Sequence, residues 1–329
     1  PATEPNAQYA LHGWAAAAGV DPTAVPGPNT EWELAEGETL GVNTPVTLRW
    51  DNGAGLIFSK QIAIDENFMF TITQSVENTG EATASVAPYA ILARHGIPPN
   101  LKNFFILHEG VVAMTDGEYS ETDWGDMPDF EFDQRAGART ETRNITENGW
   151  IGFTDHYWMS VLIPIQGTAF KSVAKYDERR DIYQTEAVSP VQTVAPGQSI
   201  TNTTQFFSGA KEWDVLNAYE QAGVYNFIDA IDWGWFAFLT KPIFWLLHHL
   251  NILIGNMGIS IIALTLFIKA LLFPLAYKSY VSMAKMKELQ PKMEKLKEEA
   301  GDDRQKMQQG MMALYKKEKV NPAAGCLPI

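Results

Sequence analysis

The chain is nearly free of cysteine and poor in positive charge. Cys326 is the single thiol among 329 residues, so no disulfide can form within the chain and no second cysteine completes a metal-ligand spacing. We expect Cys326 to be a buried small apolar residue. Lys and Arg number 25 against 39 Asp and Glu, a formal net charge of -14. This acidic balance argues against nucleic-acid binding.

The motifs of common enzymes are also missing. The sequence contains no phosphate-binding loop, no dinucleotide fingerprint and no nucleophile elbow. Asp155-His156, His95 and His108-Glu109 have no partner at a catalytic spacing, and the adjacent His248 and His249 would point about 100° apart on a helix. We therefore predict no enzymatic activity, no catalytic residue, no cofactor and no metal site.

One long apolar run is present. Residues 258–277 carry a single charge, Lys269. A helix of this length, at about 1.5 Å per residue, reaches about 30 Å, the thickness of the hydrocarbon layer of a bilayer. The hydrophobic share of 46% and the mean hydropathy of -0.15 exclude both a disordered chain and one made mostly of spans. We predict one transmembrane helix, 258–277, in a chain that folds mostly in water.

Charge is distributed unevenly about this helix. Residues 278–329 hold 11 Lys and Arg against 7 Asp and Glu, a balance of +4, which leaves -18 upstream. Basic residues collect on the cytoplasmic side of a span. We therefore place the segment after the span in the cytoplasm and the acidic segment before it outside.

Short alternating runs broken by turn residues fill residues 40–207, a pattern typical of an antiparallel β-sandwich. We predict a β domain over 1–209, in which residues 1–35 are loop. The expected strands are 46–50, 56–64, 69–76, 83–93, 150–154, 158–163 and 200–207.

Two helical segments are expected between the β domain and the span. Residues 210–231 have the apolar spacing of a connecting helix. Residues 232–257 hold an apolar stretch of about thirteen residues from Pro242 to Ile254, preceded by Trp233 and Trp235. Such a stretch is too short to span a bilayer and fits an amphipathic helix lying in the outer interface. The alternative is a buried helix of the β domain.

Beyond the span, residues 278–320 predict a cytoplasmic coiled-coil hairpin. Met286, Leu289, Met293 and Leu296 recur at steps of three and four, and Gly301 ends the first helix. Pro291 should kink that helix or begin a new one, and Asp302 with Gln305 is a candidate capping pair for the second. Residues 321–329 look like the start of a further hydrophobic segment.

The hairpin is also rich in methionine, whose flexible side chain adapts to varied apolar partners. Two interpretations stay open, a surface that contacts hydrophobic client segments and an ordinary helix–helix seam. The methionines concerned are Met283, Met286, Met293, Met307, Met311 and Met312.

Lys269 is the candidate functional residue within the membrane. A cation in hydrocarbon costs about 3 kcal/mol, so it should face water, a partner or the nearer interface. We predict that Lys269, with Ser260 and Thr265 on the same helix, lines a hydrated groove open to the cytoplasm. The alternative is a lysine whose amine reaches the inner interface.

Several motifs in residues 232–329 together resemble the YidC/Oxa/Alb family of membrane protein insertases. They are Asp232-Trp233-Gly234-Trp235, Thr240-Lys241-Pro242, Gly255-Asn256, Lys269 with Pro274-Leu275, Ser282-Met283-Ala284-Lys285-Met286, Leu289-Gln290-Pro291-Lys292, Met312 to Pro322, and Gly325-Cys326. The resemblance implies a mutarotase-like β-sandwich in the periplasm and five core spans that form a positively charged groove. The chain would hold the first of those spans, and we expect it to be a fragment of a multi-pass protein. Lys269 stands where bacterial members usually carry arginine, which keeps the charge and loses the planar bidentate donor.

The resemblance implies a membrane protein insertase and chaperone of the bacterial inner membrane, acting alone or with the Sec translocon. Its partners would be nascent membrane proteins, the lipid bilayer and the ribosome, with no nucleic acid bound by the chain itself. Two alternatives remain at this point. One is a membrane-anchored periplasmic carbohydrate-binding protein, and the other is a receptor with a cytoplasmic coiled coil.

Overall fold

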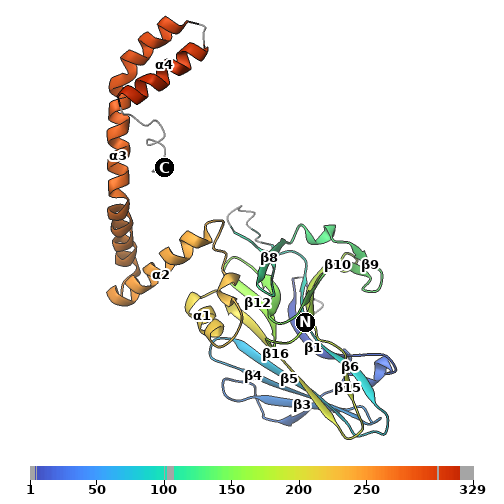
Figure 1. Cartoon of the computed structure of the whole chain (residues 1–329). Helices are drawn as coiled ribbons and strands as arrows, with labels where there is room; N and C mark the ends of the chain where they lie inside the picture. Colours follow the sequence, from blue (N-terminus) through green and yellow to red (C-terminus); the bar gives the residue numbers. More distant parts are fainter. Residues whose placement is uncertain (1–3, 5, 100, 102–106, 302–303, 319–329) are drawn as a thin grey trace. The chain divides into compact units, whose positions relative to one another are not determined.

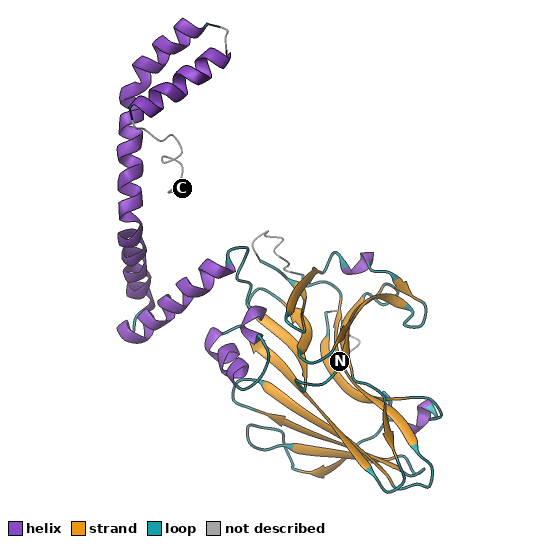
Figure 2. Cartoon of the chain, viewed as in Figure 1, coloured by secondary structure: helices purple, strands orange, loops and turns teal. Residues whose placement is uncertain are grey.

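The computed structural model describes the chain except for residues 1–3, 5, 100, 102–106, 302–303 and 319–329 (Figure 1). It divides into two compact units, Pro1–Gly234 and Trp235–Ile329. The first unit is built mainly of strands and the second is helical in its described part (Figure 2).

A nine-stranded antiparallel sheet forms one layer of the first unit. Its strand order is β2-β3-β4-β5-β16-β12-β11-β7-β8. The bounds are β2 Glu33–Glu36, β3 Val46–Asp51, β4 Leu56–Ile64, β5 Met69–Asn78, β7 Gly110–Thr115, β8 Glu118–Asp123, β11 Gly149–Thr154, β12 Trp158–Pro164 and β16 Ser199–Ala210.

A seven-stranded antiparallel sheet forms the other layer. Its order is β1-β6-β14-β13-β10-β9, with β15 also paired to β6. The bounds are β1 Gln8–Ala16, β6 Ala84–His95, β9 Phe132–Asp133, β10 Ala138–Ile145, β13 Phe170–Asp177, β14 Ile182–Val188 and β15 Gln192–Val194. Short 3₁₀ turns, η1 Pro22–Ala24 and η2 Met127–Asp129, lie between strands.

Alternation along the strands places the core on both faces of the larger sheet. In β12, Leu162 is buried in the cluster that also holds Trp124 and Tyr183, whereas its neighbour Val161 is buried in a cluster with Phe227. Successive side chains of a strand point to opposite faces, so β12 contributes to two cores at once. Full burial of each large apolar side chain contributes about 1.5–3 kcal/mol.

The second of these cores is covered by helix α1 (Trp213–Gln221) and the turn η3 (Phe227–Ala230). Leu216 of α1 and Phe227 of η3 are fully buried against Trp150 and Phe207. The indole nitrogen of Trp150 donates to the carbonyl oxygen of Tyr225 at 3.0 Å. The predicted connecting segment therefore packs on the β-rich unit.

The predicted fold class is confirmed, since two antiparallel sheets pack as a sandwich and helices follow. All seven expected strands are present, with ends shifted by three residues at most. The prediction that residues 1–35 are loop is wrong, because β1 and β2 lie within or across that range and β1 pairs with β6 over its whole length. Alanine and glycine in β1 give a weak strand signal, and pairing with β6 decides the structure.

The second unit consists of α2 (Ala237–Ile254), α3 (Met257–Ala300) and α4 (Arg304–Lys317). Helix α2 ends at Ile254 and is followed by the capping residue Gly255, whose φ of 72° suits glycine. Asn256 then caps α3 by accepting a hydrogen bond from the Ile259 amide at 3.1 Å.

Helix α3 runs without interruption for 44 residues, so the predicted span and the first hairpin helix are one element. It continues past Pro291, so the expected restart at that proline is not observed, although Figure 1 shows α3 bending toward its C-terminal end. A proline inside a helix removes one hydrogen bond and favours such a bend. Gly301 ends the helix as expected, and Asp302 of the predicted capping pair lies outside the described residues.

Candidate functional site on the long helix and the hairpin

Lys269 lies on α3 and is exposed, as are most apolar side chains near it, among them Leu266, Leu271 and Leu272. Both α2 and the Met257–Glu298 part of α3 are long and apolar enough to cross a membrane, and each contains an 18-residue stretch of high mean hydropathy, 1.3 in α2 and 2.3 in α3. Helix α2 has 18 residues, so it is longer than the apolar stretch of about thirteen that we used to assign it to the interface.

The three polar residues predicted to line a groove do not share one face of α3. At about 100° per residue, Thr265 lies about 40° from Lys269 around the helix axis, and Ser260 lies about 180° from it. Ser260 is fully buried, whereas Thr265 and Lys269 are exposed. The structure therefore brings Thr265 together with Lys269 and separates Ser260 from both.

The hydroxyl groups of the two residues are already bonded within the helix. Ser260 donates to the carbonyl oxygen of Asn256 at 2.8 Å, and Thr265 donates to that of Ile261 at 2.8 Å. Ser260 and Leu264 are buried, and α3 packs against α2. This packing leaves the Lys269 face as the free polar face of the described span.

The hairpin is formed by the end of α3 packing against α4. Leu289 is buried, the Tyr315 hydroxyl contacts the sulfur of Met293 at 3.8 Å, and the Lys292 ammonium pairs with Glu318 at 2.7 Å. The hydrogen bond from Lys292 lowers the pKa of Glu318. Two helices thus close on a seam with polar contacts at its edge.

The six predicted methionines divide between this seam and the surface. Met286, Met293, Met307 and Met311 are half-buried, which fits the interpretation as a helix–helix seam. Met283 and Met312 are 43% and 70% exposed. These two remain available for an apolar partner.

Two of the histidines considered for catalysis or metal binding, His108 and His249, are engaged in structural contacts. His108 contacts Asp123 at 2.9 Å and the carbonyl of Val111 at 2.9 Å, and His249 contacts the carbonyl of Trp245. Among the described residues, no group of three or more His, Cys, Asp or Glu could hold a metal ion.

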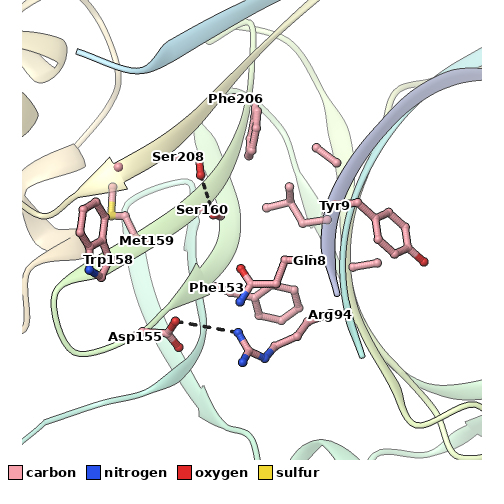
Figure 3. A pocket seen from close by; sticks show the side chains of 14 residues that line it. Gln8, Tyr9, Arg94, Phe153, Asp155, Trp158, Met159, Ser160, Phe206 and Ser208 are labelled. Atoms are coloured by element: carbon pink, nitrogen blue, oxygen red, sulfur yellow. Dashed lines mark hydrogen bonds and ion pairs between the residues drawn. The ribbon is translucent and has the colours of Figure 1, made fainter. Parts of the chain in front are cut away.

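A polar cavity that the sequence did not predict lies between the two sheets of the first unit. Strands β1 and β6 line one side, and β11, β12 and β16 with the loop after β11 line the other, around about 510 Å³ (Figure 3). Arg94 from β6 faces Asp155 at 4.0 Å, and the hydroxyls of Ser160 and Ser208 are 3.1 Å apart. These residues come from strands far apart in sequence, so no motif marks the cavity.

Comparisons with known proteins cover the whole chain. The sequence model of the YidC periplasmic domain matches residues 1–246, and that of the 60Kd inner membrane protein family matches residues 249–329. The membrane protein insertase YidC of Roseobacter denitrificans is 68% identical over 329 residues, and that of Ruegeria pomeroyi is 66% identical over 334. Each match covers 100% of this chain and 54% or 55% of the relative. The chain thus spans about half the length of these curated relatives.

Solved structures similar to the chain are more distant. A galactose mutarotase related enzyme from Lactobacillus acidophilus aligns with a TM-score of 0.37 at 10% identity, covering 55% of this chain and 71% of that one. A putative aldose 1-epimerase from Escherichia coli aligns with a TM-score of 0.36 at 13% identity, covering 55% and 69%. Neither similarity bears on function.

Proposed function

Because the chain belongs to the YidC family of membrane protein insertases, we propose that the protein inserts and folds other proteins in the bacterial inner membrane. The family matches extend over both units, including α3 and the hairpin. A membrane-anchored carbohydrate-binding protein would leave the hairpin and its match without a role, so that alternative is not favoured.

The observation that carries the mechanism is the position of Lys269. It is the single charge in residues 258–277, and it lies exposed on one face of α3 beside Thr265 while the opposite face holds the buried Ser260. A cation there is costly in hydrocarbon and far less so in a water-filled groove. We assign Lys269 and Thr265 to such a groove, with Ser260 supporting the helix packing behind it.

In this mechanism the groove lowers the free energy of bringing polar chain into the membrane. The ammonium group of Lys269 attracts acidic residues of a client, and the groove's water solvates polar side chains until apolar segments move into lipid. No nucleotide hydrolysis is needed, because burial of apolar client segments supplies the driving force.

The hairpin serves in capture. Met283 and Met312 offer exposed, adaptable side chains to apolar client segments. We place the hairpin in the cytoplasm and the β-rich unit in the periplasm, because the segment after the span is basic and the one before it is acidic. The Sec translocon and the ribosome are the proposed cellular partners.

Photo-crosslinking from single positions tests this function. A crosslinking amino acid at Thr265, Met283 or Met312 should form adducts with an arrested nascent membrane protein in inner-membrane vesicles. Leu271 is the matched control, since it is exposed on α3 about 160° around the helix from Lys269 and close to it in depth. Client adducts as strong at Leu271 as at Thr265 would contradict a groove on the Lys269 face.

A further inference from the structure

The cavity between the two sheets has the size and the rigid walls of a ligand site. Its volume of about 510 Å³ falls within the range of about 300–1,000 Å³ found for small-molecule sites. Its walls are strands held in two sheets, with one loop after β11, so its shape exists before a ligand arrives.

The charges in the cavity cancel. The Arg94 side chain is 7% exposed and lies 4.0 Å from the carboxylate of Asp155, and its Nε donates to the carbonyl oxygen of Gly96 at 3.2 Å. Burial lowers the pKa of Arg94 and raises that of Asp155. A pair with no net charge disfavours an ionic ligand, yet it offers one strong donor and one strong acceptor side by side.

Further groups can both donate and accept hydrogen bonds. The hydroxyls of Ser160 and Ser208 use one hydrogen between them, so a second hydrogen and several lone pairs remain for a ligand. The amide of Gln8, which Figure 3 shows facing the cavity, supplies a donor and an acceptor. The hydroxyl groups of a ligand can likewise both donate and accept hydrogen bonds.

Apolar ring surface accompanies these polar groups. Phe153, Phe206 and Trp158 line the cavity, and Trp158 is 62% exposed. Aromatic rings supply large apolar surfaces for packing. Ring compounds rich in hydroxyls have apolar C–H faces that pack on such surfaces while their hydroxyls turn to polar neighbours.

Two other ligand classes fit less well. An extended peptide would add to the edge strand β1, but Lys60 donates to the carbonyl oxygen of His12 in β1 at 2.6 Å. That carbonyl group is therefore already occupied and is not available to pair with an added strand. An acyl chain would cover Arg94 and Asp155 without satisfying them, which costs free energy.

We propose that this cavity binds a neutral, hydroxyl-rich ring compound of the size of a mono- or disaccharide. In that complex one hydroxyl of the ligand donates to Asp155, a neighbouring hydroxyl accepts from Arg94, and the C–H face packs on the aromatic rings. This binding is separate from the insertion of client proteins at Lys269.

Binding of sugars to the purified chain tests the proposal. The chain is held in lipid nanodiscs, because sugar-headed detergents would compete, and is titrated with maltose, lactose and N,N′-diacetylchitobiose by calorimetry and saturation-transfer NMR. At least one sugar should bind saturably. Asp155→Asn should weaken that binding at least tenfold and Gln8→Ala at least threefold, whereas Asp129→Asn, exposed on η2, should leave it unchanged.

Gln8 is exposed, so its variant keeps the test valid if Asp155→Asn fails to fold. The proposal is overturned if none of the three sugars binds, or if Gln8→Ala and a folded Asp155→Asn bind as the unmodified chain does. Tighter, Asp155-dependent binding of an extended heptapeptide or of decanoate would also overturn it, in favour of those ligand classes.

Discussion

Gly152 in β11 lies directly against the main chain of Ser160 in β12. A Cβ atom at Gly152 would overlap the carbonyl oxygen of Ser160 and would lie 2.6 Å from the Cα of Val161. Both neighbours are backbone atoms of a paired strand, so they cannot turn away as a side chain could. The close approach also fixes the strand that carries the Ser160 hydroxyl into the cavity.

Gly152→Ala should therefore destabilise the first unit by about 1–3 kcal/mol, the usual cost of forcing extra atoms into a packed site. Urea unfolding followed by tryptophan fluorescence measures the change in the free energy of unfolding. Gly125→Ala is the control, because a Cβ at that position meets nothing within 4 Å. Equal stability of the two variants would show that β11 and β12 can separate at little cost.

The stability of the first unit should also depend on pH through His12. Burial, and to a lesser degree the charge of Lys60, lower the pKa of His12 to about 3, and its Nε2 is buried without a hydrogen-bond partner. In the unfolded chain the pKa is about 6.5, so the unfolded state binds an extra proton between these values. The contribution of neutral His12 to the free energy of unfolding is complete above about pH 6.5 and is lost as the pH falls toward 3.

At pH 4.5 this contribution should have dropped by on the order of 2 kcal/mol relative to pH 7.5. His12→Gln stays neutral throughout, so it should lose less stability than the unmodified chain over the same interval. Urea midpoints at the two pH values give the difference, and the carboxylates, common to both proteins, cancel. If the unmodified chain and His12→Gln lose the same stability between pH 7.5 and pH 4.5, the acid sensitivity comes from groups other than His12.

Alternation of buried and less buried side chains is a signal that the sequence shows directly. In β5 burial alternates from Ile72 to Asn78, and the predicted and observed bounds agree within two residues. Strand β7, which the sequence analysis did not predict, has all but one of its residues buried, so its apolar run has no period. Strand β1 was missed because its residues favour no structure until β6 pairs with them.

Of the three α3 residues predicted to line a groove, two share a face of the helix and one does not, for a reason that lies in helix geometry. Lys269 and Thr265 are four residues apart and share a face, whereas the nine residues from Ser260 to Lys269 bring the two to opposite faces. The residue numbers alone could have shown that Ser260 and Lys269 lie on opposite faces, because each residue turns an α-helix by about 100°. The cavity at Arg94 and Asp155 could not be predicted, because only the packing of one sheet on the other brings β6 and the β11–β12 loop together.

The hairpin offers a test that separates packing from capture. Leu289 is 5% exposed and Met312 is 70% exposed. Leu289→Ala should destabilise the packing of α3 on α4 by about 2–5 kcal/mol, since it leaves a cavity. Met312→Ala should change stability by less than about 0.5 kcal/mol and should weaken crosslinking to nascent chains.

Amide hydrogen exchange of α4 measures the first effect and client crosslinking from Met283 measures the second. Faster exchange is expected for Leu289→Ala alone. If Met312→Ala leaves client crosslinking unchanged while exchange in α4 also stays unchanged, the exposed methionine has no part in capture.

Substitution of Lys269 tests whether its charge or its shape matters in insertion. Lys269→Ala removes the cation from the Thr265 face, so clients with acidic translocated segments should insert several-fold more slowly. Lys269→Arg keeps the charge and adds a planar donor, so insertion should stay within about twofold of the unmodified protein.

The measurement is protease protection of a client with an acidic periplasmic segment, beside one whose segment is neutral. The neutral client is the control, because it makes no ion pair with Lys269 and should insert equally in all three proteins. If Lys269→Ala slows both clients alike, the lysine maintains the structure or hydration of the groove and does not attract client carboxylates.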